Sequence, residues 1–173
     1  MKERNLEIGI FRILYFSKNA TYLRWYNLLL SFIMLIFLSI SILNKNFSIK
    51  INVSPFATVA ITGLSFTLAL LIATTTNVFE KDELLDIVEV DENEFYILIG
   101  PYVYTALIWL FLGLITTIKF INILNSVCLL NQILDIVIVF LFTMGLCNLF
   151  DLIITNIQDL IKKIERDIND RNQ

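Results

Sequence analysis

Three long runs of the sequence, 25–43, 55–79 and 95–118, contain no Asp, Glu, Lys or Arg. A fourth apolar run, 130–154, contains only two acidic residues, Asp135 and Asp151. A helix rises about 1.5 Å per residue, so about 20 apolar residues cross the hydrocarbon core of a bilayer. Lipid admits only helices or closed barrels, and these runs lack the alternating pattern of barrel strands. The sequence therefore predicts an all-α fold, a four-helix transmembrane bundle.

Composition agrees with this prediction. Of the 173 residues, 57% are hydrophobic and 17% are charged, against about 45–50% and about 25% in ordinary soluble domains. This excludes a soluble globular protein and leaves too little chain for a separate soluble catalytic domain. We expect one integral membrane domain over 1–173.

The positions of Lys and Arg predict the orientation of the four runs. Ten of these residues precede the first run, lie between the second and third, or follow the fourth, whereas three lie on the opposite side. We therefore expect a multi-pass protein of the inner (cytoplasmic) membrane with both termini in the cytoplasm. The cytoplasmic parts are the N-terminal segment 1–24, the loop 80–94 and a helical tail 155–173.

Local signals mark some helix boundaries. Ser54 and Pro55 predict a helix start, with Ser54 as the N-cap and Pro55 in the first helical position. Gly100 and Pro101 predict a kink in the third span. The first 20 residues mix apolar and basic side chains and could form a helix on the inner membrane surface.

The residue types present argue against catalysis. The chain has no His, which excludes His-based catalytic triads and HExxH metal sites, and its five glycines are too scattered for a phosphate-binding loop. Cys128 and Cys147 stand 19 residues apart along one predicted helix, too far for a disulfide. We expect no enzyme, no cofactor, no metal and no direct nucleic-acid contact.

The second run carries small or weakly polar residues at steps of three and four, which places them on one helix face. This face favours close helix packing, and its alternative is the lining of a pore in an oligomer. Its members are Thr58, Thr62, Ser65, Ala69, Ala73 and Thr76.

Asp135 and Asp151 are costly inside or at the edge of lipid. We expect Asp135 to pair with Lys119 at the outer side, and Asp151 to pair with Arg24 at the inner side. The alternative is that the two carboxylates belong to an ion or proton path.

The middle loop concentrates acidic residues and has a net charge of −7. Interleaved apolar residues indicate a contact with a cytoplasmic protein that has a basic surface, although an acidic run is usually a solvated face. The acidic residues are Glu80, Asp82, Glu83, Asp86, Glu89, Asp91, Glu92 and Glu94.

The apolar pattern of the fourth run continues into the tail, so one amphipathic helix is expected to leave the membrane. Its apolar face must be covered by the first 20 residues or by other subunits, unless the tail lies on the lipid surface. Coverage by other subunits would make the protein a homo-oligomer. The residues of this face are Ile153, Ile157, Leu160, Ile164 and Ile168.

The span pattern, the acidic loop and the helical tail together resemble the small four-span membrane subunits of bacterial phage-defence systems, such as the Kiwa membrane component. This resemblance implies an oligomeric inner-membrane sensor or anchor that engages a soluble cytoplasmic partner in antiviral defence. The alternative is a pore-forming protein or ion channel that depolarises the membrane. The resemblance has no motif that assigns a function to a particular residue.

Overall fold

The structure is a computed structural model, and it describes residues 9–43, 51–78, 92–121 and 128–171. Within these ranges every regular element is helical, as predicted. In chain order the elements are α1 (Ile10–Phe16), the 3₁₀ turn η1 (Lys18–Ala20), α2 (Trp25–Leu43), α3 (Ser54–Ala73), the π-helical turn η2 (Thr74–Val78), α5 (Glu92–Phe120) and α6 (Cys128–Arg171).

Three of these helices are long and apolar enough to cross a membrane, in the segments 54–76, 93–120 and 130–165. A further apolar helix, Trp25–Ser41, is shorter. The described part of the chain is thus a helical protein of multi-pass membrane type.

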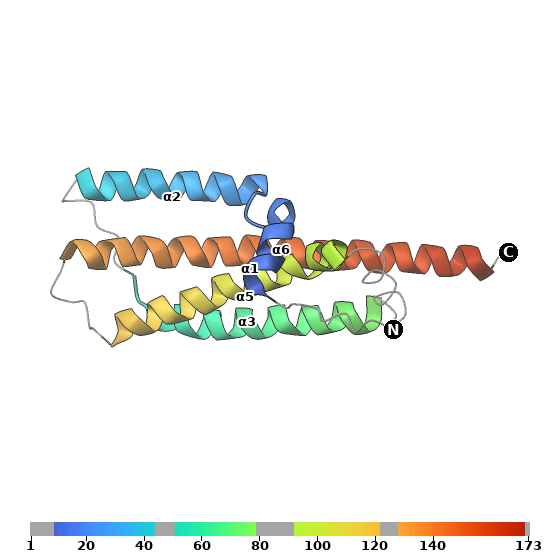
Figure 1. The fold of residues 1–173 in the computed structure, drawn as a ribbon. Helices are drawn as coiled ribbons and strands as arrows, with labels where there is room; N and C mark the ends of the chain where they lie inside the picture. Colours follow the sequence, from blue (N-terminus) through green and yellow to red (C-terminus); the bar gives the residue numbers. More distant parts are fainter. Residues whose placement is uncertain (1–8, 44–50, 79–91, 122–127, 172–173) are drawn as a thin grey trace.

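Helix α6 lies in the middle of the molecule and separates α2 from α3 and α5 (Figure 1). Among the described elements, α2 packs against α6 alone, whereas α3, α5 and α6 all contact one another. The four long helices therefore do not enclose one common core. Only three of them do, and α2 is attached to the outside of α6.

The core of the three-helix part is built around Trp109 on α5, which is 1% exposed. A methyl group added at Gly63 on α3 would lie 2.5 Å from Cδ2 of the indole, and one added at Gly145 on α6 would lie 2.9 Å from Cη2. The two glycines leave the space that this ring fills. Ala60, Leu112 and Ile138 complete the buried cluster.

The start of α3 differs from the prediction by one residue. Ser54 is already the first helical residue, Val53 is the N-cap, and no side chain of the N-cap forms a capping bond. Instead, Oδ1 of Asn52 accepts a hydrogen bond from the backbone N–H of Ser54 at 3.3 Å. An Asn side chain two residues upstream provides this local acceptor.

Helix α1 packs across the early part of α5. Gly100 on α5 permits this contact, because an added methyl group would overlap Cβ of Ser17. Pro101 lies inside α5, and the yellow-green beginning of this helix runs in a different direction from its yellow remainder in Figure 1. The outward face of α1 is apolar, with Phe11 90% exposed.

Candidate functional site

The predicted pair Lys119–Asp135 is present where the end of α5 meets the beginning of α6. Both side chains are largely buried, and the ammonium Nζ of Lys119 donates a hydrogen bond to Oδ1 of Asp135. A buried carboxylate without this partner would be strongly destabilising. The pair therefore accounts for Asp135 without an ion path.

The second predicted pair, Arg24–Asp151, is present at the opposite end of the helices. It joins the segment just before α2 to α6. Asp135 and Asp151 are 16 residues apart on one continuous helix, which corresponds to about 24 Å along its axis. The two ion pairs therefore mark the two ends of the apolar layer.

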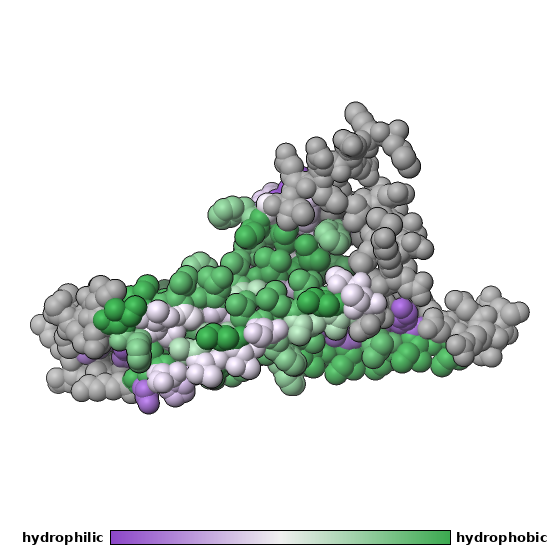
Figure 2. Space-filling view, turned by 90° about the horizontal axis from the view of Figure 1, so that it is seen from below, coloured by the Kyte–Doolittle hydropathy of each residue, from purple (hydrophilic) through white to green (hydrophobic). Residues whose placement is uncertain are grey.

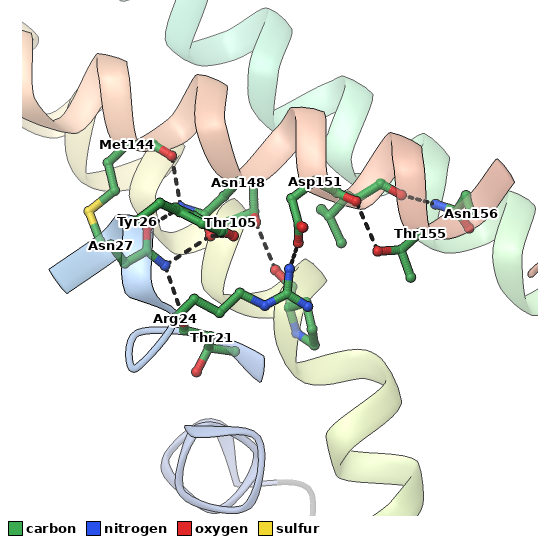
Figure 3. Close-up of polar contacts among 12 residues, drawn as sticks. Thr21, Arg24, Tyr26, Asn27, Thr105, Met144, Asn148, Asp151, Thr155 and Asn156 are labelled. Atoms are coloured by element: carbon green, nitrogen blue, oxygen red, sulfur yellow. Dashed lines mark hydrogen bonds and ion pairs between the residues drawn. The ribbon is translucent and has the colours of Figure 1, made fainter. Parts of the chain in front are cut away.

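Next to Arg24–Asp151, two buried amides hold α2 against α6 (Figure 3). Nδ2 of Asn148 donates to Oδ1 of Asn27 at 2.9 Å, and Nδ2 of Asn27 donates to Oδ1 of Asn148 at 3.2 Å. The same amides also donate to the carbonyls of Thr21 and Met144, each at 2.8 Å. We call these contacts, together with the pair Arg24–Asp151, the α2–α6 junction.

A second polar cluster, which we call the three-helix junction, joins the end of α3 to α5 and α6. Oγ1 of Thr74 and Oη of Tyr102 are 2.8 Å apart, and Tyr102 donates to Oδ1 of Asn156 at 3.0 Å. Thr74 also bonds Asn156 directly. Thr74 opens the π-helical turn η2, a type of irregularity that recurs at functional sites.

Sequence reasoning predicted neither the two amides of the α2–α6 junction nor the three-helix junction. A signal was available, because Asn27, Asn148 and Asn156 lie within or beside apolar runs, where an amide needs a polar partner. Nothing in the sequence shows which amides pair, since that depends on the relative positions of helices distant in the chain.

The small-residue face predicted on the second run points away from the other helices. Thr58, Thr62, Ser65, Ala69 and Thr76 are exposed, and Ala73 is partly buried. Helix α3 instead packs within the chain through Ala60, Gly63 and Thr67. Seen from the side of α3, the surface is largely apolar, with residues of intermediate hydropathy among green ones (Figure 2).

Two of the exposed hydroxyls on this face are hydrogen-bonded within their own helix and do not require water. Oγ1 of Thr62 donates to the carbonyl of Thr58 at 3.0 Å, and Oγ1 of Thr76 donates to that of Ile72 at 2.8 Å. Hydroxyls bonded within their own helix are tolerated in lipid. This face can therefore contact lipid or another subunit without lining a pore.

The acidic loop falls almost wholly outside the described residues. Only its last three residues lie within α5, where Glu94 is exposed. The predicted contact of residues 80–91 with a basic partner therefore stays a prediction.

The apolar face predicted on the tail is present, and apart from the partly buried Ile153 its residues are not covered by the other described elements. We define the α6 stripe as Leu146, Phe150, Ile153, Ile157, Leu160, Ile164 and Ile168. Phe150 is 65% exposed and Ile157 is 53% exposed, and the stripe residues from Leu160 onward are about half exposed. Helix α1, one of the two covers considered above, packs on α5 instead.

Two pockets lie along α6. An apolar groove of about 240 Å³ lies between α2 and α6 and includes Met34, Phe37, Val139 and Thr143 in its lining. A pocket of about 200 Å³ near the three-helix junction includes Arg24, Tyr102, Asp151 and Asp159. Among the described residues no group of three or more potential ligands could hold a metal ion.

No known protein family, curated protein or solved structure matches the chain. The resemblance to membrane subunits of phage-defence systems therefore stays a prediction.

Proposed function

We propose that the chain is an oligomeric anchor or sensor subunit of the inner membrane, with four spans and both termini in the cytoplasm. Its cytoplasmic surface would engage a soluble partner. In this proposal α2 is the remaining span, and its 19 residues extend about 28 Å, close to the thickness of the hydrocarbon core.

The junctions support the alternating direction of these spans. The beginnings of α2 and α5 lie beside the end of α3 and the late part of α6, joined by Arg24–Asp151 and by the three-helix junction. The end of α5 and the beginning of α6 meet at Lys119–Asp135. Successive helices therefore run in opposite directions, as a chain that crosses a membrane four times requires.

The length of α6 is the main observation that supports the functional part of the proposal. Its 44 residues extend about 66 Å, about twice the hydrocarbon thickness. The 20 residues after Asp151 would project about 30 Å beyond the inner ion pair, and Figure 1 shows this helix extending past the other described helices. A projecting helix with an uncovered apolar stripe suits assembly with protein rather than catalysis.

The topology is tested with single cysteines in a variant lacking Cys128 and Cys147. Asn52→Cys and Gln158→Cys change exposed side chains near opposite ends of the described helices. In intact cells an impermeant thiol reagent should label Asn52→Cys alone, and both variants should react after permeabilisation. Preferential labelling of Gln158→Cys in intact cells would overturn the orientation.

Assembly is tested by native mass spectrometry of the protein in detergent. A defined multimer is expected, and the multimer should capture a cytoplasmic protein only while the acidic loop is intact. A strictly monomeric protein over the accessible concentration range would contradict the oligomeric anchor.

The pore alternative draws on one observation, the outward small-residue face of α3. If several copies placed this face around an axis, purified protein in vesicles should release a trapped monovalent cation. The hydroxyls bonded within α3 make lipid or protein contact sufficient, so we expect no release above that of empty vesicles.

A further inference from the structure

The α6 stripe passes without interruption from the apolar layer into the projecting part of the helix. Leu146 and Phe150 precede Asp151, whereas Ile157, Leu160 and Ile164 follow it. The first four steps along the stripe are 4, 3, 4 and 3 residues and average the 3.5-residue spacing of a coiled-coil seam, and the last two steps are 4 residues each. One continuous helix therefore presents one apolar seam on both sides of the membrane boundary.

This continuity limits what can cover the stripe. Lipid can cover Leu146 and Phe150, but it cannot follow a straight helix that projects about 30 Å from the boundary. A soluble protein can cover Ile157 and Ile164, but it cannot enter the apolar layer. An occupant of the whole stripe needs a membrane-spanning part and a cytoplasmic part in one helix.

We propose that the occupant is α6 of a second copy of this chain, packed parallel and in register along the stripe. This inference depends on the proposed four-span topology, which gives every copy the same orientation in the membrane. An antiparallel pair is then excluded. Each stripe residue faces its own counterpart across the interface.

The surroundings of the stripe fit this arrangement. Val139 and Thr143 continue it towards the beginning of α6, at steps of four and three residues before Leu146. Both line the apolar groove between α2 and α6, so the partner helix has a lateral recess where the two helices approach. The polar residues Gln158, Asp159 and Lys162 lie off the stripe and stay in water.

The test uses oxidative crosslinking of single cysteines in isolated membranes, in a variant lacking Cys128 and Cys147. On-stripe positions are Phe150 in the apolar layer and Ile157 and Ile164 beyond it. Gln158→Cys and Lys162→Cys are off-stripe controls on the same helix. Crosslinked dimers should form at all three on-stripe positions, at least about tenfold faster than at either control.

A second variant probes the same seam by polarity. Ile157→Ser combined with Ile164→Ser should reduce crosslinking at Phe150→Cys by about tenfold or more, because Ser buries much less apolar surface than Ile in the interface. The matched variant, Ile157→Val with Ile164→Val, should keep it. These positions are exposed in the single chain, so the Ser variant should still insert and show the same thiol labelling.

Three results would overturn the inference. They are equal crosslinking at on-stripe and off-stripe positions, absence of dimers at every position, and on-stripe crosslinks only to a different protein. If the labelling of Asn52→Cys and Gln158→Cys still gives the expected topology, these failures leave the four-span proposal intact. A reversed labelling pattern would remove both.

Discussion

Trp109 shows how two missing side chains determine the packing of the three-helix part. Gly63 on α3 and Gly145 on α6 each leave room for the indole. Protein interiors are close-packed, so an added methyl group must displace the ring or separate the helices. The position of Trp109 therefore makes a larger side chain unfavourable at both glycines, although their own backbone geometry is ordinary helix.

Gly63→Ala should destabilise the protein by about 1–3 kcal/mol, the usual cost of overpacking. Gly113→Ala is the matched control on α5, because its added methyl group would meet Ala60 at an ordinary 3.6 Å. Thermal unfolding in detergent is detected as loss of the soluble protein peak in size exclusion. It should show a lower Tm for Gly63→Ala alone. Equal Tm values for the two variants would contradict the packing described.

Lys119→Leu should be more damaging than the double variant Lys119→Leu with Asp135→Leu. The single change leaves a buried carboxylate unpaired, at a cost of about 3–5 kcal/mol, whereas replacing both partners with apolar residues is often close to neutral. The comparison is made by thermal unfolding of both variants in the same detergent. A double variant as unstable as the single one would favour the alternative that Asp135 has a role of its own.

Both ion pairs could be predicted from the sequence, because an ionised group in an apolar run has few possible partners. Asp135 and Asp151 lie at opposite ends of one run, and Lys119 and Arg24 are the nearest cations at those ends. The amides could not be paired in this way. Asn27 and Asn148 are 121 residues apart, and only the docking of α2 on α6 selects that pairing.

At the scale of elements, α2 depends on one set of contacts, the α2–α6 junction. The other long helices each pack against more than one described neighbour. It buries one side against α6, while residues such as Phe32 and Leu35 are exposed. In a membrane, apolar contact with a neighbouring helix gains little over contact with lipid. The polar junction is therefore expected to decide whether α2 stays attached.

Arg24→Ala combined with Asn27→Ala should loosen α2 without unfolding α3, α5 and α6. A disulfide between cysteines at Met34 and Phe140, which line the α2–α6 groove, reports the attachment. The rate of disulfide formation should fall at least about tenfold, since a loss of about 1.4 kcal/mol in the free energy of attachment lowers the equilibrium constant for attachment of α2 tenfold. Ser39→Ala is the control, because its exposed hydroxyl donates to the carbonyl of Leu35 within α2 itself. An unchanged rate would show that apolar contacts suffice.

Element boundaries were predictable where a charged residue or a helix-breaking residue ends the apolar run. The predicted 25–43 coincides with α2, and the continuation of the fourth run into the tail is confirmed by α6. The packing face of α3 was not predictable. Small residues occur on two faces of this helix, and only the bulk of Trp109, located on α5, decides that Ala60 and Gly63 turn inward.

At the scale of the whole molecule, the projecting part of α6 is separable from the rest. The last of its residues that line the described pockets is Asp159, and the three-helix junction reaches only to Asn156. The attachment of α2 to the outside of α6 could not be predicted from the four apolar runs, because hydropathy indicates which helices contact lipid but not which helices contact each other.

Removing residues 160–173 should therefore leave the Tm of the monomer in detergent nearly unchanged. Removing residues 156–173 should lower it, because Tyr102 and Thr74 lose the amide of Asn156 that they share. The difference expected is about 1–2 kcal/mol, because two interhelical hydrogen bonds are lost and each contributes about 0.6 kcal/mol or somewhat more between membrane helices. Equal losses in the two truncations would show that the end of α6 also stabilises the helices beside it.

Among the described helices α2 contacts α6 alone, and this has a consequence for biogenesis. Residues are added at about 5–20 per second during translation, so roughly 5–22 s separate the end of α2 from Asp151 on α6. During that interval α2 has been synthesised but the part of α6 that it contacts has not. Asn27 and Arg24 therefore lack the partners on α6 that they have in the folded protein. A premature stop before Asn148 would leave Asn27 and Arg24 without their partners on α6, and polar groups without partners are costly in the membrane.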